Sequence, residues 1–220
     1  MEDRPPLLQD LALGWNVGEA KYRSLRQRLR VRLGRNPQPS AGIVDSQSVK
    51  STGVGGEERG YDGGKQIKGR KRHLLVDTEG LLLGAKVHAA NVMDRDGIKL
   101  LLEGANDRFP RLSHLWLDAG YNGKGKGKDW VEKTLGWAAQ IVRRPSRKRW
   151  VPEGVELDWD KILPPEGFIV LPRRWVIERS LSWIGQNRRM SKDYERLPQS
   201  GEAFIYVAMS RVMSRRLARA

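Results

Sequence analysis

The chain has 220 residues, with 41 lysines and arginines against 26 aspartates and glutamates and a formal net charge of +15. Hydrophobic residues make up 39% of it, which is enough for a core and excludes a wholly disordered protein. The absence of cysteine excludes disulfides and cysteine-ligated zinc sites, and no apolar stretch approaches the roughly 20 residues of a membrane span. We therefore expect a folded, cytoplasmic (intracellular) protein with no membrane partner, and nucleic acid is the first candidate for its ligand.

The first forty residues are expected to form an N-terminal appendage of two parts. Residues 1–20 show weak periodicity and are predicted to be loosely ordered. Residues 21–35 are predicted to form a basic helix, which is ended by Pro37 and Pro39. Its apolar positions fall on one helical stripe and are Tyr22, Leu25, Leu29 and Leu33. The arginines around this stripe either face solvent or contact DNA, and the sequence leaves both interpretations open.

Beyond residue 40 the pattern becomes strand-like. Two short apolar runs, 42–44 and 115–117, are each followed at once by an aspartate, Asp45 and Asp118. Between them, HLLVDTEGLLLGAKVHAA is predicted to be a hairpin with its tight turn at 78–80. The stretch before the hairpin, GGEERGYDGGKQIKGRKR, is predicted to be a connection rich in glycine and lysine. A further short strand is predicted in WAAQIVRRP.

Helices are predicted to alternate with the later strands. They are expected within 91–109, 129–136, 173–195 and 201–220. A meander of strands, followed by alternating strands and helices, indicates a mixed sheet with helices on its faces, class α/β. We expect this domain to span residues 41–220.

The two aspartates that follow apolar runs are candidate metal ligands. A carboxylate inside a buried strand is costly unless it is paired or bound to a metal. The carboxyl end of a central strand is where α/β folds place their ligands. If the two strands are neighbours, the carboxylates of Asp45 and Asp118 converge and repel each other, and a divalent cation is the usual remedy.

Glu178 is the one acidic residue between Arg173 and Asp193, in a stretch that is otherwise basic. On a helix this stretch has a buried stripe made of Val176, Ile177, Trp183, Ile184 and Met190. Glu178 lies on another face, in a row of cations with a gap at Gly185. It either pairs with Arg174 one turn before it or serves as a metal ligand, and the spacing leaves both open.

Several longer motifs follow one another along most of the chain, between about residues 21 and 217. They are PSAGIVDSQSVK, RGYDGGKQIKGRKRHLLVDTEGLLL, NVMDRDGIKLLLE, LWLDAGYNG, LPRRWVIERSLSWIGQNRRMSKDYERLP and AFIYVAMSRVMSRRL. In this order they resemble the DDE-type insertion-sequence transposases of the IS-four-like or IS-five-like branch. The resemblance implies a ribonuclease-H-like catalytic core in which two aspartates and one glutamate hold divalent metal ions.

Residue by residue, the resemblance implies Asp45, Asp118 and Glu178 as both the catalytic triad and the ligands of two Mg²⁺ (or Mn²⁺) ions. It also implies metal-dependent DNA strand cleavage and transfer, with transposon ends and target DNA as partners. A homo-oligomer on DNA stays open. Carboxylate oxygens suit Mg²⁺ better than imidazole does. The three histidines lack ligand spacing and are expected to be structural; they are His73, His88 and His114.

Basic residues near the predicted triad are expected to contact DNA phosphates. One group lies in the glycine-rich connection, which is not a phosphate-binding P-loop because the required order of residues is absent. The others lie in RRPSRKRW and in the Glu178 stretch. The full set is Lys65, Lys68, Arg70, Lys71, Arg72, Arg143, Arg144, Arg174, Arg188, Arg189 and Lys192.

The chain departs from the family pattern at three places. Fewer than fifty residues precede Asp45, so the family's helical DNA-recognition region is expected to be missing, as in a truncated copy. Leu171 and Gly185 stand where the glutamate helix usually has a tyrosine and a basic residue. GKGKGKDW, after Asp118, differs from the usual segment. Two alternatives stay open: a non-enzymatic DNA-binding remnant of a transposase, and a general basic nucleic-acid-binding protein whose acidic residues form surface ion pairs.

Overall fold

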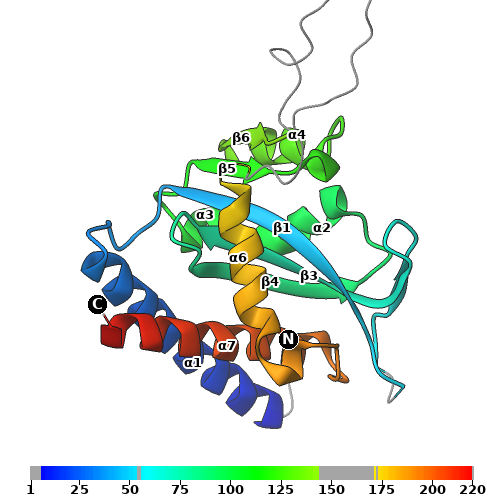
Figure 1. Ribbon diagram of the computed structural model, residues 1–220, viewed down its shortest axis with the longest axis horizontal. Coiled ribbons are helices and arrows are strands. Elements are labelled where there is room, and N and C mark those ends of the chain that lie inside the picture. The colour runs from blue at the N-terminus through cyan, green and yellow to red at the C-terminus, as the bar shows by residue number, and fades with distance from the viewer. Residues whose placement is uncertain (1–5, 54–55, 144–170, 172, 220) are drawn as a thin grey trace, which may run out of the picture.

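The computed structural model describes residues 6–53, 56–143, 171 and 173–219 (Figure 1). Its strands form one mixed sheet. They are β1 (Ala41–Lys50), β2 (Gly60–Asp62), β3 (Ile67–Asp77), β4 (Leu82–Ala89), β5 (His114–Leu117) and β6 (Ala138–Ile141). β1 lies in the middle, antiparallel to β3 on one side and parallel to β5 on the other. β6 extends the sheet parallel to β5, and the far edge of β3 carries β2 and β4.

Helices cover both faces of this sheet. They are α1 (Pro6–Arg32), α2 (Asp94–Leu102), α3 (Ala105–Arg108), α4 (Lys128–Trp130), α6 (Arg174–Gly185) and α7 (Pro198–Arg219), with short turns η1 (Ala119–Tyr121), η2 (Val131–Leu135) and η3 (Arg188–Met190). One buried cluster lies under α2, α3 and η2, and a second lies under α1, α6 and α7. The mixed sheet between helices confirms the predicted α/β class and the ribonuclease-H-like arrangement. No helix in the described part of the chain could cross a membrane.

The alternation of side chains along each strand assigns residues to the two faces. On β1, Ile43 belongs to the cluster under α6 and α7, whereas Val44 belongs to the cluster under α2. On β5, Trp116 packs against the cluster under α1, α6 and α7, and Leu117 belongs to the cluster under α2, α3 and η2. Asp45 follows Ile43 by two residues, so its side chain lies on the face that α6 covers.

Four boundaries differ from the sequence predictions. β1 does not end at Asp45 but continues to Lys50, and β3 begins at Ile67 within the stretch predicted to be a loop. α1 begins at Pro6, so much of the segment predicted to be loosely ordered is helical. α6 ends at Gly185 rather than continuing toward residue 195. Glycine has the highest backbone entropy of any residue, which favours a helix end at this position.

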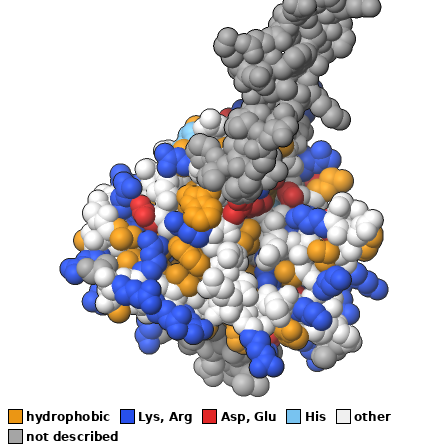
Figure 2. All heavy atoms as spheres, viewed as in Figure 1, with side chains coloured by type: hydrophobic (Ala, Val, Ile, Leu, Met, Phe, Trp, Pro, Cys, Tyr) orange, Lys and Arg blue, Asp and Glu red, His pale blue; other side chains and the backbone are white. Residues whose placement is uncertain are grey.

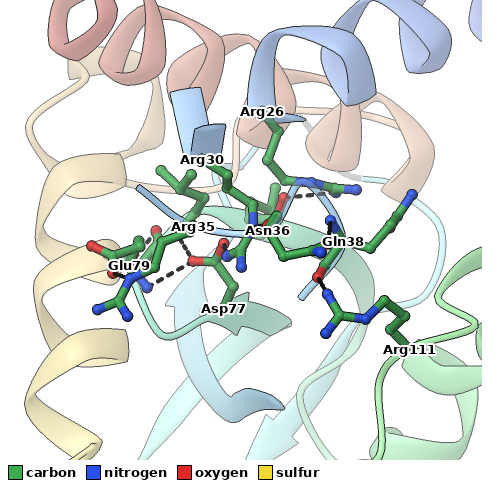
Figure 3. Close-up of polar contacts among 12 residues, drawn as sticks. Arg26, Arg30, Arg35, Asn36, Gln38, Asp77, Glu79 and Arg111 are labelled. Atoms are coloured by element: carbon green, nitrogen blue, oxygen red, sulfur yellow. Dashed lines mark hydrogen bonds and ion pairs between the residues drawn. The ribbon is translucent and has the colours of Figure 1, made fainter. Parts of the chain in front are cut away.

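The C-terminal end of α1 is fixed to the turn between β3 and β4 (Figure 3). Arg30 forms a buried ion pair with Asp77, and Arg35 pairs with Glu79 at 2.9 Å. The other carboxylate oxygen of Asp77 accepts hydrogen bonds from the backbone of Glu79 and Leu81, at 2.9 and 2.8 Å. Asp77 therefore holds the hairpin turn and the helix together, and α1 packs on the body that contains the sheet.

Candidate active site

Asp45 and Asp118 lie side by side on adjacent strands. In the parallel ladder Ile43 is opposite Trp116, and continuing this register by two residues puts Asp45 level with Asp118. Asp118 directly follows the last residue of β5, so it comes at a strand end as predicted. Asp45 lies inside β1, not at its end, because β1 pairs with β3 as far as Lys50. The two carboxylates therefore meet beyond the end of β5, next to the middle of β1.

The two carboxylates differ in their surroundings. The side chain of Asp45 is 13% exposed, and its Oδ1 accepts a hydrogen bond from the Ser46 backbone N–H at 2.8 Å. Burial raises the pKa of Asp45 to about 6, against the opposing effects of this hydrogen bond and of Arg174. Asp118 is 25% exposed and accepts a hydrogen bond from the Gly120 backbone N–H at 2.9 Å. This bond caps η1 and fixes the direction of the Asp118 side chain.

α6 brings Glu178 to the two aspartates. The helix is held on the sheet by Ile177 and Ile184, which are almost completely buried. It is also held by Ser180, whose hydroxyl donates to the carbonyl of Gly80 at 2.8 Å. Gly80 has φ +79°, and a Cβ there would lie 2.8 Å from the Ser180 oxygen, so only glycine lets the hairpin turn approach α6 this closely.

Arg174, the first residue of α6, lies among all three carboxylates. Its guanidinium contacts Asp45 Oδ2 at 3.3 Å through Nη2 and Asp118 Oδ2 at 3.4 Å through Nη1. The contact from Nη2 to Glu178 Oε1 is 3.9 Å. The intrahelical pair between Arg174 and Glu178 is therefore real, but it is the longest of three contacts made by one cation. Three carboxylates from β1, from the end of β5 and from α6 converge on the same group.

The chemistry of these side chains fits divalent metal ions. Carboxylate oxygens are the ligands that Mg²⁺ and Mn²⁺ prefer, and all three point at one centre of positive charge. Burial is the main cause of the raised pKa of Asp45, and it outweighs the opposing effects of the Ser46 hydrogen bond and of Arg174. As they lie, no three acidic or histidine side chains of the described residues are close enough to enclose a metal ion. Arg174 stands between the three, so metal binding requires its side chain to move.

The prediction that residues 65–72 form a phosphate-binding loop is wrong for Arg70, Lys71 and Arg72. All three are in β3 and at most 5% exposed. Arg70 pairs with Asp193 at 3.0 Å, and Arg72 donates to the carbonyls of Met190 and Lys192 at 2.7 and 3.0 Å. Both arginines thus fasten the segment after α6 to the sheet, and their charges are already used inside the fold.

The other predicted DNA contacts are placed differently. Five of them are exposed in the structure: Lys65, Lys68, Arg143, Arg188 and Lys192. Arg189 is also exposed but pairs with Glu195 at 2.8 Å, and Arg144 lies outside the described residues. Because α6 ends at Gly185, Arg188, Arg189 and Lys192 do not continue the helical face of Glu178. In Figure 2, acidic side chains gather in one band on the face of the molecule that α6 covers, while lysines and arginines are spread over the rest of that face.

Sequence reasoning missed Asp94, which lies behind Asp45 on the α2 side of the sheet. Asp94 accepts from the Ser46 hydroxyl at 2.7 Å and pairs with the buried Lys71 at 2.8 Å. Its signal in the sequence was an acid in the first turn of a predicted helix, a position that usually needs no further explanation. Its partner Lys71 had been assigned to a loop, so the pair could not be inferred.

A second buried group lies close to the Asp118 turn. The Tyr121 hydroxyl is 2.7 Å from Nε2 of His73, whose Nδ1 is 2.8 Å from Nε2 of His88. Burial, with the neighbouring His88, lowers the pKa of His73 to about 3, so the ring is neutral at physiological pH. The expectation that these two histidines are structural fits their place in this chain of contacts, which fixes the end of η1.

Comparison with known proteins adds one match. The family model described as Transposase DDE domain matches residues 36–213 of the chain. None of the curated proteins matches it. The matched range includes the whole sheet, α6 and the three converging carboxylates.

Proposed function

The chain belongs to the family of transposases with a DDE domain, and from this premise we propose that Asp45, Asp118 and Glu178 are its metal-binding catalytic triad. The proposed reaction is cleavage of DNA strands and their transfer to target DNA. Its finer assignments, the insertion-sequence branch and a catalytic domain that spans residues 41–220, belong to the same proposal.

The observation that supports the triad is the convergence of three carboxylates on one guanidinium, at 3.3, 3.4 and 3.9 Å. They come from three separate elements, β1, the end of β5 and α6. Surface ion pairs that form by chance do not bring three like charges together, because like charges repel. A site that concentrates negative charge in a protein of net charge +15 indicates selection for cation binding.

Divalent ions held by these oxygens would activate the attacking oxygen of water or a DNA 3′-hydroxyl and stabilise the leaving oxygen. The residues of the chain supply position and charge. Phosphoryl transfer depends mostly on both, so a rigid sheet under two of the ligands suits it. The hydrogen bonds from the backbones of Ser46 and Gly120 orient the carboxylates of Asp45 and Asp118.

The exposed cations are proposed to hold the DNA beside this site. Lys65 lies in the turn between β2 and β3, close enough to Asp45 to lower its pKa. Lys68 and Lys192 are both exposed. Each is close in sequence to a residue in a buried ion pair, Lys71 and Asp193 respectively. Contacts of this kind bind phosphate without reading bases, so we propose that duplex binding is mainly electrostatic.

A second candidate function is a DNA-binding protein without catalytic activity. It is favoured by Arg174, which contacts all three carboxylates and so offers an alternative reason for their convergence. Under this alternative the acidic cluster is a structural ion-pair network. DNA binding would persist, and divalent metal would have no role.

Cleavage of DNA that carries the ends of the element flanking the coding sequence separates the two functions. Wild type is expected to cut these ends with Mg²⁺ or Mn²⁺ and not with EDTA. Asp118→Asn should abolish cutting and retain DNA binding, whereas Asp107→Asn, the same change at an exposed position of α3, should retain both. Equal cutting by wild type and Asp118→Asn, or none by wild type, would count against the triad.

A further inference from the structure

Arg174 makes contacts that are longer than those of a close ion pair. Charge-assisted hydrogen bonds between nitrogen and oxygen are typically about 2.7–2.9 Å long. The three contacts of Arg174 are 3.3, 3.4 and 3.9 Å, so no carboxylate is bound closely. By comparison, the structural pair of Arg70 with Asp193 is 3.0 Å long and is backed by bonds to three backbone carbonyls. The two arginines are thus held in different ways.

The position of Arg174 permits movement. It is the first residue of α6, where a side chain has no preceding helical turn to pack against. Its side chain is 22% exposed, which leaves a direct route to solvent. Arg70, in contrast, is 1% exposed and enclosed by the segment that follows α6. A change of rotamer would take the Arg174 guanidinium out of the acidic cluster without disturbing the backbone.

Arg174 and a divalent ion compete for the same atoms. Nη2 of Arg174 contacts Asp45 Oδ2 and Glu178 Oε1, and Nη1 contacts Asp118 Oδ2. A Mg²⁺ ion contacts its oxygens at about 2.0–2.1 Å, so an ion on these oxygens leaves no room for the guanidinium between them. The ion also brings two positive charges to the carboxylates, where Arg174 brings one. Occupancy of the cluster by Arg174 and by a metal ion is therefore mutually exclusive.

We propose that Arg174 is a built-in counter-ion of the acidic cluster, which holds the three carboxylates together until a divalent ion displaces it. This inference rests on the proposed function, since it takes the triad to be a metal site. Arg174 is thus a positioning residue, whose planar guanidinium fork keeps the metal-free cluster assembled.

The inference predicts opposite effects of one substitution. Arg174→Gln removes the competitor, so the affinity for Mn²⁺ in the absence of DNA should rise about fivefold or more, the effect of one unit charge about 4 Å away in a water-like medium. The same variant loses the counter-ion, so its melting temperature in EDTA should fall. Arg174→Lys keeps the charge without the fork and should retain an affinity close to that of wild type.

The experiment measures Mn²⁺ binding by electron paramagnetic resonance and melting in EDTA, on the full chain. Arg111→Gln, which removes an exposed arginine outside the cluster, is the control and should change neither. Unchanged or weaker Mn²⁺ affinity in Arg174→Gln would overturn the inference, because it would mean that Arg174 does not compete.

Failure of the proposed function gives a different result. In that case wild type and Asp118→Asn would bind Mn²⁺ equally, or neither would bind it, whatever residue 174 is. That outcome would remove the metal site and the inference with it. Binding by wild type that is lost in Asp118→Asn, together with no gain in Arg174→Gln, would leave the metal site intact and reject the counter-ion alone.

Discussion

At the scale of single residues, Asp45 lowers the stability of the metal-free fold. Its carboxylate is largely buried beside a second carboxylate, and burial raises its pKa from 3.8 to about 6. Between these two values the folded chain binds more protons than the unfolded chain, so stability falls as pH rises through this window. Asp45 therefore destabilises the metal-free protein at neutral pH, and a bound cation would offset this.

The destabilising effect of Asp45 can be tested by measuring thermal melting of the metal-free protein in EDTA. Asp45→Asn should be more stable than wild type at pH 7.5, by about 3 kcal/mol, since the pKa of Asp45 rises from 3.8 to about 6 and each pKa unit corresponds to about 1.4 kcal/mol. At pH 4 the difference should largely vanish, because wild-type Asp45 is then protonated in the folded chain. Asp107→Asn serves as the control at an exposed position. A difference that is equal at both pH values would contradict the raised pKa.

Two basic residues of β3 give a second prediction at this scale. Arg70→Gln leaves Asp193 buried without its partner, and the free energy of unfolding should fall by about 3–5 kcal/mol. Lys68→Gln, two positions earlier on the same strand, is exposed and should leave stability unchanged while weakening DNA binding. Urea unfolding and fluorescence anisotropy with duplex DNA measure the two effects. The assignment of roles is wrong if both variants lose DNA affinity without loss of stability.

At the scale of elements, α6 is held by fewer residues than its sequence pattern indicated. Ile177 and Ile184 are buried as predicted, but Val176 and Trp183 are only partly buried, and Met190 is buried beyond the end of the helix. The guanidinium groups of Arg179 and Arg216 lie over the ring of Trp183, 4.8 and 5.6 Å from its centre. The helix is therefore fixed to the sheet mainly by its isoleucines, and Trp183 packs with arginines.

Substitutions on α6 should reflect this difference. Ile177→Ala should lower the free energy of unfolding by about 2–5 kcal/mol and weaken Mn²⁺ binding, because Glu178 is the next residue. Trp183→Ala should cost less than the 3–5 kcal/mol of a fully buried ring and leave Mn²⁺ affinity unchanged. Chemical unfolding, with Mn²⁺ titration of the folded variants, compares them. A larger loss from Trp183→Ala would contradict the packing described here.

α7 carries a row of arginines that the proposed function explains. Arg211, Arg215 and Arg219 are exposed and four residues apart, so they share one face of the helix. Like charges at this spacing are mildly destabilising, which a polyanion along the row would relieve. In Figure 2 a row of basic side chains runs along the side of the molecule where α1 and α7 lie.

Replacement of the three α7 arginines by glutamine tests this row. Because each phosphate contact adds about 0.9 to the slope of log affinity against log salt, the slope should fall by up to about 3. Anisotropy titrations with duplex DNA between about 50 and 200 mM salt measure it. Lys133→Gln, an exposed cation of η2 under the other face of the sheet, should leave the slope unchanged. An unaltered slope in the triple variant would mean that DNA does not reach α7.

The elements best predicted from sequence were those with strong local signals. The hairpin of β3 and β4 was found from its turn, and β5 from its apolar run before Asp118. The second half of β1 could not be found, since Ser46, Gln47 and Ser48 are polar and are recruited by pairing with β3. The roles of Arg70 and Arg72 could not be inferred because several of their acceptors are carbonyls more than one hundred residues away.

In the candidate site, too, the features with local signals could be predicted and those that depend on tertiary structure could not. The three carboxylates could be chosen from the strand and helix patterns and the resemblance, since each pattern is local. The place of Arg174 at their centre could not, because spacing predicts only its pair with Glu178. Its contacts with Asp45 and Asp118 depend on how α6 crosses the sheet, which is a property of the tertiary structure.

At the scale of the whole molecule, the residues that stabilise the fold are different from those of the proposed site. Two apolar clusters and the buried pairs of Arg30 with Asp77 and Arg70 with Asp193 hold the sheet and helices together. The acidic cluster lies at the edge of this body, where β5 ends and α6 begins. A hollow of about 520 Å³ between α1, β4 and α7 contains no residue of the triad. The proposed site therefore lies outside this hollow.

The central claim is that Asp45, Asp118 and Glu178 share one metal site, and melting across a Mg²⁺ titration tests it most directly. A ligand that binds only the folded state stabilises it by about 2.7 kcal/mol at one hundred times its dissociation constant. Wild type and the control Glu103→Gln, an exposed position after α2, should gain equally. Asp118→Asn and Glu178→Gln should each gain much less at the same Mg²⁺ concentration. If both variants gain as much as wild type, the three carboxylates are not metal ligands, and their ion pairs with Arg174 are the whole reason for their convergence.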